Sequence, residues 1–326
     1  MRRLAGLAAC VLFACGGNGT RPAPVPEGVA FCDQVIPRDA KAVRCDRHYS
    51  TDFPIVARPE QPLPLSDLLP LANLPMLEDV DVDADGIAEL APLRGLVKLR
   101  RLKLNGAVPD DLSPLAGLVA LEEVEIPGAL VKDTNALAKL TRLRSVALGA
   151  ELADLAGLAN VSSLERLHLG RSAVTDLAPL AGKHALVELS LNDTAVRDLA
   201  PLAGLRSLTR LELERTPVHD LAPLASCPAL ADLDLDGAAV ESLAGISGIT
   251  TLRLIAINRT KVSDLRPIAA SSGIEYVRAY AAPVTDLSPL FGMKNLREVI
   301  LGGIAEKVPP EQLERLRQDN PAIELR

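Results

Sequence analysis

Residues Ala185–Arg206 read ALVELSLNDTAVRDLAPLAGLR, and this stretch decides the fold because its two neighbours repeat its pattern. Ser163–His184 reads SLERLHLGRSAVTDLAPLAGKH, and Ser207–Pro228 reads SLTRLELERTPVHDLAPLASCP. The three segments share a length of 22 residues and the frame L-x-x-L-x-L-x-x-x-x-V-x-D-L-x-P-L. A fixed period of this length is typical of a solenoid, in which each unit buries its apolar face only by stacking on the next.

The same register continues in both directions and gives ten consecutive units. These begin at Met76, Lys98, Ala120, Arg142, Ser163, Ala185, Ser207, Ala229, Thr251 and Gly273. The Arg142 unit is one residue shorter than the others, and an eleventh strand is expected to start at Asn295. Residues 76–294 therefore form one elongated repeat domain. Residues 295–326 are expected to cap its end with a short helix that starts in Pro309–Gln312.

The frame resembles the leucine-rich repeat family, in particular its bacterial internalin-like class, whose repeats share the D-L-x-P-L turn. The resemblance covers about two thirds of the chain and implies an α/β-type horseshoe solenoid with a parallel β-sheet on its concave face. Alternation along each L-x-x-L-x-L strand points the leucines inward and the intervening residues outward. Proline in the second half of the unit blocks a long helix, so turns or 3-10 segments are expected on the convex face.

Two positions of the frame are expected to carry structural polar residues. A carboxylate before the turn can accept hydrogen bonds from the following backbone N–H groups. These acids are Glu89, Asp111, Asp133, Asp154, Asp176, Asp198, Asp220, Asp264 and Asp286. Members of the family usually have Asn at the ninth frame position, where this chain has Ser172, Thr194, Thr216, Thr260, Ala107, Ala129 and Ala238. A hydroxyl replaces an amide only in part, so we expect a less regular ladder between turns.

Composition limits the possible functions. Aromatic residues make up 2% of the 326 residues and tryptophan is absent, so the core is expected to be aliphatic. The net charge of -7 is opposite in sign to the basic surface that nucleic-acid binding needs, and no nucleic-acid partner is expected. Beyond the N-terminus, no apolar run approaches the ~18 residues of a membrane span.

The first residues, Met1–Cys15, read MRRLAGLAACVLFAC, and their basic start and apolar stretch indicate an export signal. Leu12–Cys15, followed by glycine, resembles the lipobox of bacterial lipoproteins, which implies cleavage of residues 1–14 and a lipid on Cys15. Cys10 is the alternative lipidated residue, and an ordinary secretory signal is the other interpretation. The lipid would anchor the chain in the cell envelope, with the outer membrane preferred and a secreted or periplasmic chain as the alternative.

The region between the signal and the repeats is expected to hold a tether and a cap. Residues 15–31 are rich in Gly and Pro, which is typical of a linker. Residues 32–75 are expected to form the N-terminal cap, in which Cys32 and Cys45 form a disulfide because the chain is exported. A metal site is disfavoured there, since only His48 lies near the cysteines and no second pair exists.

Motifs for catalysis or metal binding are weak. Asp81–Gly86 reads DVDADG and imitates the start of an EF-hand calcium loop, but the twelfth loop position is Pro92 instead of Glu. An acidic strand with outward-facing Asp79, Asp81 and Asp83 is preferred, because the apolar residues between them fit the repeat frame. The histidines show no H-E-x-x-H spacing, and no G-x-S-x-G motif occurs. We therefore assign no catalytic residue, metal or cofactor.

The outward positions of the concave face form the informative surface. By register, Tyr276, Arg278 and Tyr280 lie side by side there, close to Leu254. Beside them lies an acidic strip formed by Asp232, Asp234 and Asp236. Tyr and Arg often dominate the binding energy of interfaces, and neighbouring acids set orientation and on-rate. These residues are predicted to bind a protein, in preference to a glycan. The alternative is that they only cover the sheet near its C-terminal cap.

The predicted function is a non-catalytic protein-interaction scaffold of the bacterial cell envelope, acting as a monomer. Two other functions fit the same repeats. One is a hydrolase whose site is assembled across units of the concave face, and the other is a structural envelope component without a specific ligand. The repeat fold alone does not choose among them.

Overall fold

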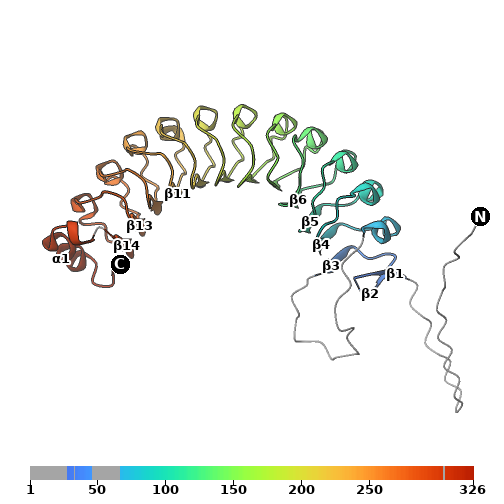
Figure 1. Cartoon of the computed structure of the whole chain (residues 1–326), viewed down its shortest axis with the longest axis horizontal. Coiled ribbons are helices and arrows are strands. Elements are labelled where there is room, and N and C mark those ends of the chain that lie inside the picture. Colours follow the sequence, from blue (N-terminus) through green and yellow to red (C-terminus); the bar gives the residue numbers. More distant parts are fainter. Residues whose placement is uncertain (1–27, 33, 46–66, 304) are drawn as a thin grey trace, which may run out of the picture.

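The computed structural model describes residues 28–32, 34–45, 67–303 and 305–326. The predicted signal peptide with both candidate lipidated cysteines, most of the tether, and His48 lie outside the described residues. The repeats form a continuous arc, with strands along its inner side and short helical turns along its outer side (Figure 1). The predicted horseshoe solenoid is confirmed.

A parallel sheet lines the concave face. Over the described residues it has 13 strands in the order β15 to β3, so that every strand pairs with its neighbours in sequence. Its strands are β3 (Ala42–Cys45), β4 (Asp79–Asp83), β5 (Arg101–Asn105), β6 (Glu123–Ile126), β7 (Ser145–Leu148), β8 (Arg166–His168), β9 (Glu188–Ser190), β10 (Arg210–Glu212), β11 (Asp232–Asp234), β12 (Leu254–Ala256), β13 (Tyr276–Arg278), β14 (Glu298–Ile300) and β15 (Glu324–Leu325).

Short 3-10 helices return the chain along the convex face, as predicted. They are η1 (Leu69–Asn73), η2 (Ala91–Gly95), η3 (Ser113–Leu115), η4 (Asn135–Leu137), η5 (Ala156–Leu158), η6 (Ala178–Leu180), η7 (Ala200–Leu202), η8 (Ala222–Ser226), η9 (Ala244–Ile246), η10 (Arg266–Ile268), η11 (Ser288–Leu290) and η12 (Ala305–Lys307). Of these, η4, η5 and η9 form without the turn proline.

The aspartates before the turns have the predicted structural role, whereas Glu89 makes no such bond among the described residues. Asp176 Oδ1 accepts a hydrogen bond from the Ala178 N–H at 2.8 Å, which satisfies a donor at the start of η6. The same bond is made by Asp111, Asp133, Asp154, Asp198, Asp220, Asp264 and Asp286. Where the acid is missing, Ser242 Oγ accepts from the Ala244 N–H at 3.1 Å.

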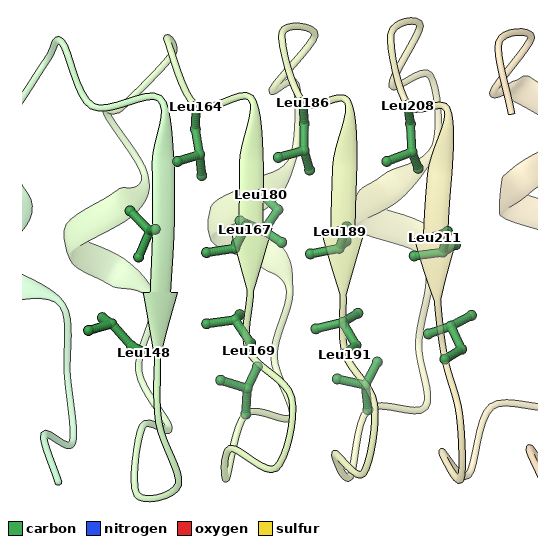
Figure 2. Close-up of a cluster of buried hydrophobic side chains, with 14 of the residues drawn as sticks. Leu148, Leu164, Leu167, Leu169, Leu180, Leu186, Leu189, Leu191, Leu208 and Leu211 are labelled. Carbon is green, nitrogen blue, oxygen red and sulfur yellow. The ribbon is translucent and has the colours of Figure 1, made fainter. Parts of the chain in front are cut away.

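Rows of leucines fill the interior between the two faces. Leu167, Leu189 and Leu211 come from three consecutive strands, are fully buried, and stack in one row (Figure 2). Burial of each such side chain stabilises the fold by about 1.5–3 kcal/mol relative to an exposed leucine. Cys227 is buried in the same interior, as its frame position predicts. The repeats therefore share one continuous core.

The short unit packs unusually closely on the unit before it. Its missing residue falls in the loop between Leu148 and Leu152. Past this loop, Asp154 forms an isolated parallel bridge with Asp133. The Asp154 N–H donates to the Lys132 carbonyl oxygen at 3.0 Å. The shortened loop thus coincides with backbone pairing between the two turns.

Charges of alternating sign follow one rim of the sheet, two residues before the first inward strand residue. Salt bridges between adjacent units join Arg100 to Glu122 (2.7 Å), Arg144 to Glu165, and Arg253 to Glu275 (2.8 Å). The equivalent position of three intervening units holds Val187, Thr209 and Ala231. Each exposed pair contributes at most about 1 kcal/mol.

The N-terminal cap is built on the predicted disulfide. Cys32 and Cys45 are bonded, which confirms the pairing. Cys45 ends β3, the first strand of the large sheet, and Cys32 follows a strand of a hairpin. The hairpin pairs β1 (Gly28–Phe31) with β2 (Gln34–Pro37) in antiparallel fashion and was not predicted.

The C-terminal cap combines a helix with an added strand. The predicted helix is α1 (Pro310–Asp319), and its Leu316 is fully buried against the last repeat. Gln312 Oε1 accepts from the Leu287 N–H at 2.7 Å, which ties the helix to η11. Strand β15 then extends the sheet beside β14 and was not predicted. Within the described ranges, no helix has the length and apolar character that crossing a membrane requires.

Candidate functional site

The concave face presents the outward residues of adjacent strands side by side. In register, Asp232 lies beside Leu254, Leu254 beside Tyr276, and Tyr276 beside Glu298. The structure therefore brings together the acidic strip (Asp232, Asp234 and Asp236) and an aromatic patch (Leu254, Tyr276, Arg278 and Tyr280), as the frame predicts.

Most charges on the first units are compensated by neighbouring units. Asp79 accepts a hydrogen bond from Arg101 on the next strand and lies 3.7 Å from Arg44 on the previous one. Lys103 and Glu125 form a salt bridge of 3.4 Å. These charges stabilise contacts between units, and each therefore has a role in the fold.

The acidic strip differs from this pattern. Within the described part of the chain, none of its three carboxylates forms a salt bridge. The pKa of Asp234 is raised from its ordinary value of 3.8 to about 6, mainly by burial and also by the nearby carboxylates of Asp236, Glu214 and Glu212. From β12, the other strand beside it, Leu254, Ala256 and the following Asn258 are uncharged, whereas Arg253, which is paired with Glu275, lies close enough to act electrostatically on Asp232. The strip is thus a local excess of negative charge.

Asp236 also has a structural role that the sequence did not reveal. Its Oδ1 accepts from the Asn258 N–H at 2.9 Å, and its Oδ2 accepts from the Asn258 side-chain amide at 2.7 Å. Asn258 Oδ1 in turn accepts from the Tyr280 N–H at 2.7 Å. This chain of bonds fixes the backbone of Tyr280 relative to the acidic strip. Asp234 Oδ1 accepts from the Asp236 N–H at 2.9 Å, whereas Asp232 lies outside this chain.

Side-chain amides that link adjacent turns occur at the seventh frame position, two residues before the ninth position that the family pattern implies. Among the described residues, the hydroxyls of Thr194, Thr216 and Thr260 form no hydrogen bond with a neighbouring turn. Instead, each donates to a carbonyl oxygen of its own unit at 2.7 Å. Ser172 Oγ is buried without a hydrogen-bond partner among the described residues. Asn192 repeats the Asn258 arrangement, because its Oδ1 accepts from the N–H of Glu214 at 2.9 Å.

The aromatic patch contains an exposed ring that lies close to two residues of other strands or turns. Tyr280 is 44% exposed, and the Arg259 guanidinium lies 5.4 Å from the centre of its ring. A cation–π contact at an exposed site stabilises the ring position by about 0.5–1 kcal/mol. Gly302 also lies against the ring, since an added Cβ there would come within 2.6 Å of it. The ring position therefore depends on an arginine and a glycine.

Arg278 of the aromatic patch has no described hydrogen-bond partner at one of its guanidinium nitrogens. Its Nε is buried and has no hydrogen-bond partner among the described residues. The nearest carboxylate oxygen belongs to Glu298 at 4.0 Å, and Glu298 is also paired with Arg326 at 3.2 Å. Arg259 was missed at the sequence level, although an arginine at the frame position that holds Gly237 and Gly303 is a usable signal.

The candidate metal-binding and histidine motifs of the sequence have structural surroundings where the structure describes them. They contain no group of three or more His, Cys, Asp or Glu side chains arranged to hold a metal ion. The residues Asp79–Asp83 of the calcium-loop imitation form strand β4, as the acidic-strand interpretation predicts. His184 Nδ1 lies 3.1 Å from the Gly204 carbonyl oxygen, a structural contact between units.

Comparison with solved structures places the fold. An internalin of Listeria monocytogenes is 25% identical, with a TM-score of 0.73, and the match covers 78% of this chain and 75% of that one. A leucine-rich repeat protein of Leptospira interrogans is 16% identical, with a TM-score of 0.56 and 81% of each chain covered. The leucine-rich repeat ectodomain of an Arabidopsis thaliana membrane receptor kinase, solved in complex with CASPARIAN STRIP INTEGRITY FACTOR 2, is 20% identical, with a TM-score of 0.62, and the match covers 79% of this chain and 34% of that one.

Searches of family models and of curated proteins gave no match. The fold assignment accordingly rests on the repeats, the sheet and the solved neighbours. The chain is a leucine-rich repeat solenoid, and its structural neighbours include bacterial internalins.

Proposed function

We propose that the concave face binds a protein partner and catalyses no reaction, with the aromatic patch as its anchor. The observation that carries the proposal is the exposed Tyr280 ring, held in place by Arg259 and Gly302 beside Tyr276. A fixed aromatic ring loses little conformational entropy on binding, which is typical of residues that dominate interface energy. The complex of the plant receptor ectodomain supports the use of this fold for ligand binding.

Capture from cells tests the aromatic anchor. The variant Tyr276→Ala/Tyr280→Ala should reduce recovery of crosslinked partners at least ~10-fold, because each buried aromatic anchor is worth about 2 kcal/mol or more. The full chain would be crosslinked in whole cells, and its partners identified by mass spectrometry.

The matched control removes two exposed apolar side chains outside the patch. Val97 and Val119 are 59% and 57% exposed and lie in the connections before their strands, so Val97→Ala/Val119→Ala should leave recovery unchanged. Equal recovery from both double variants would contradict the anchor. A wild-type chain that returns no reproducible partner would favour a structural envelope component.

We further propose that the chain is anchored in the cell envelope by a lipid on Cys15. The lipobox-like run that ends in this cysteine supports the proposal, and several acyl chains would hold a protein stably where one would not. The variant Cys15→Ala should lose metabolic labelling with a fatty-acid analogue and leave the membrane fraction, whereas Cys10→Ala should keep both. The opposite result would assign the lipid to Cys10, and no labelling in the wild type would indicate an ordinary secretory signal.

A further inference from the structure

Two strands of the sheet carry the same acidic sequence but in different surroundings. Asp79, Asp81 and Asp83 on β4 occupy the same outward positions as the three aspartates of the acidic strip. On β4, Asp79 is bonded to Arg101, and Asp83 accepts from the Asn105 side chain at 3.2 Å. The β4 aspartates therefore stabilise the neighbouring unit. Among the described residues no aspartate of the acidic strip forms a salt bridge, although Arg210 and Arg253 act on Asp232 at longer range.

The strand before the strip does not supply the missing positive charge. Arg210 is shared between Glu212 at 2.8 Å and Glu188 at 3.6 Å. Arg215 donates to Asp193 at 2.7 Å and also pairs with Glu214 at 3.0 Å. Both arginines thus pair directly with acids of their own or an earlier unit. Arg210 acts on Asp232 only at longer range, and among the described residues neither arginine forms a salt bridge with the three aspartates.

The strand after the strip offers an apolar floor. Leu254 and the buried Ala256 lie beside Asp232 and Asp234, and Tyr276 lies one strand further. Strands of a sheet are ~4.8 Å apart, so Tyr276 is roughly 10 Å from Asp232. A ligand that spans this distance contacts the acidic strip at one end and the aromatic patch at the other.

We propose that the acidic strip and the aromatic patch together bind a basic segment of the partner protein, with Lys or Arg side chains over Asp232 and Asp234 and an apolar or aromatic side chain over Leu254 and Tyr276. This inference rests on the proposed function and names the chemistry of its ligand. Asp232 and Asp234 are separated by about 6.6 Å along the strand, and the described residues contain no group of three or more His, Cys, Asp or Glu side chains arranged to hold a metal ion. Two side-chain cations fit this separation.

Selection from a library of random displayed peptides tests the inference on the full chain. Enriched peptides should carry at least two Lys or Arg residues close to an aromatic residue or leucine. Binding of the synthesised peptides should weaken at least ~10-fold in Asp232→Asn/Asp234→Asn, because two charged contacts are lost. It should change less than ~2-fold in the matched variant Asp79→Asn/Asp81→Asn, which removes the same charges from the same frame positions.

Acidity gives a second readout. Since a pKa of about 6 leaves Asp234 mostly protonated near pH 5 and mostly ionised at pH 7.5, the wild-type chain should bind the basic peptide more tightly at the higher pH. The single variant Asp234→Asn should lose most of this dependence. If Asp79→Asn/Asp81→Asn does not fold, Glu123→Gln/Glu125→Gln on β6 replaces it as the control, because it also removes two charges from the same frame positions.

The outcomes separate this inference from the proposed function. Enrichment of acidic or uncharged peptides, no enrichment, displacement of the peptide by calcium, or equal effects of the β4 and β11 variants would overturn the basic-segment ligand. If cellular partners still depend on Tyr276 and Tyr280 in that case, the aromatic anchor stands alone. If basic peptides need Asp232 and Asp234 but cellular capture ignores the tyrosines, the proposed anchor fails instead.

Discussion

The variant Gly157→Ala should lose about 3 kcal/mol of stability, the cost of forcing a methyl group into a close-packed contact. Gly157 takes the place of the turn proline in the short unit. A Cβ at this position would lie 1.9 Å from the carbonyl oxygen of Thr134 and 2.2 Å from its carbonyl carbon. These backbone atoms cannot move aside easily, because the Thr134 oxygen accepts from the Leu137 N–H at 2.9 Å and the Thr134 N–H donates to Asp154.

Urea unfolding followed by circular dichroism measures this loss. The control is Gly117→Ala, where an added Cβ meets no atom within 4 Å. Alanine should be neutral or slightly stabilising there, since it restricts the unfolded chain. Equal midpoints for the two variants would show that the short unit tolerates the methyl group by moving away from the preceding turn.

Removal of the N-terminal disulfide should have the second large effect. The bond closes a separation of 13 residues in sequence, and a loop of this size corresponds to about 3 kcal/mol of unfolded-state entropy. In Cys32→Ser/Cys45→Ser, the hairpin should separate from β3 and leave the first buried row open to water. Backbone amides of Val43 and Val80 should then exchange with solvent faster than those of the central strands.

Hydrogen exchange of the wild-type chain in a reducing agent provides the control. Cys227 is buried and unpaired, so reduction should reproduce the double variant without affecting the middle of the solenoid. Protection of Val43 that is unchanged by either treatment would show that packing alone holds the cap. Faster exchange throughout the sheet would instead indicate that the caps and repeats unfold as one unit.

The repeat frame predicts well whether a strand residue points into the core or outward, because one period assigns the equivalent position in every unit at once. It placed Tyr276 and Tyr280 on the same outward face, and the structure confirms this placement. The frame does not predict which side chains of adjacent units form hydrogen bonds with one another. The chain of bonds from Asp236 through Asn258 to Tyr280 depends on side-chain rotamers that no period encodes.

The ends of the molecule were also harder to predict than its middle. Hairpin β1–β2 and strand β15 lie outside the repeats, where no second copy reveals the pattern. Both are short, and each is held by tertiary contacts: one by a disulfide and the other by pairing with β14. Isolated two-stranded pairings are marginal in water, so local sequence alone does not specify them.

The alternating rim charges limit how the number of repeats can change. Deleting the single unit that carries Glu122 would bring Arg144 beside Arg100 and turn an attraction into a repulsion. Deleting two adjacent units there would restore opposite neighbours. In the middle, where Val187, Thr209 and Ala231 occupy the rim, one unit can be lost or duplicated without this conflict. Growth or shrinkage of the array is therefore least restricted at its centre, just before the surface proposed to hold the partner.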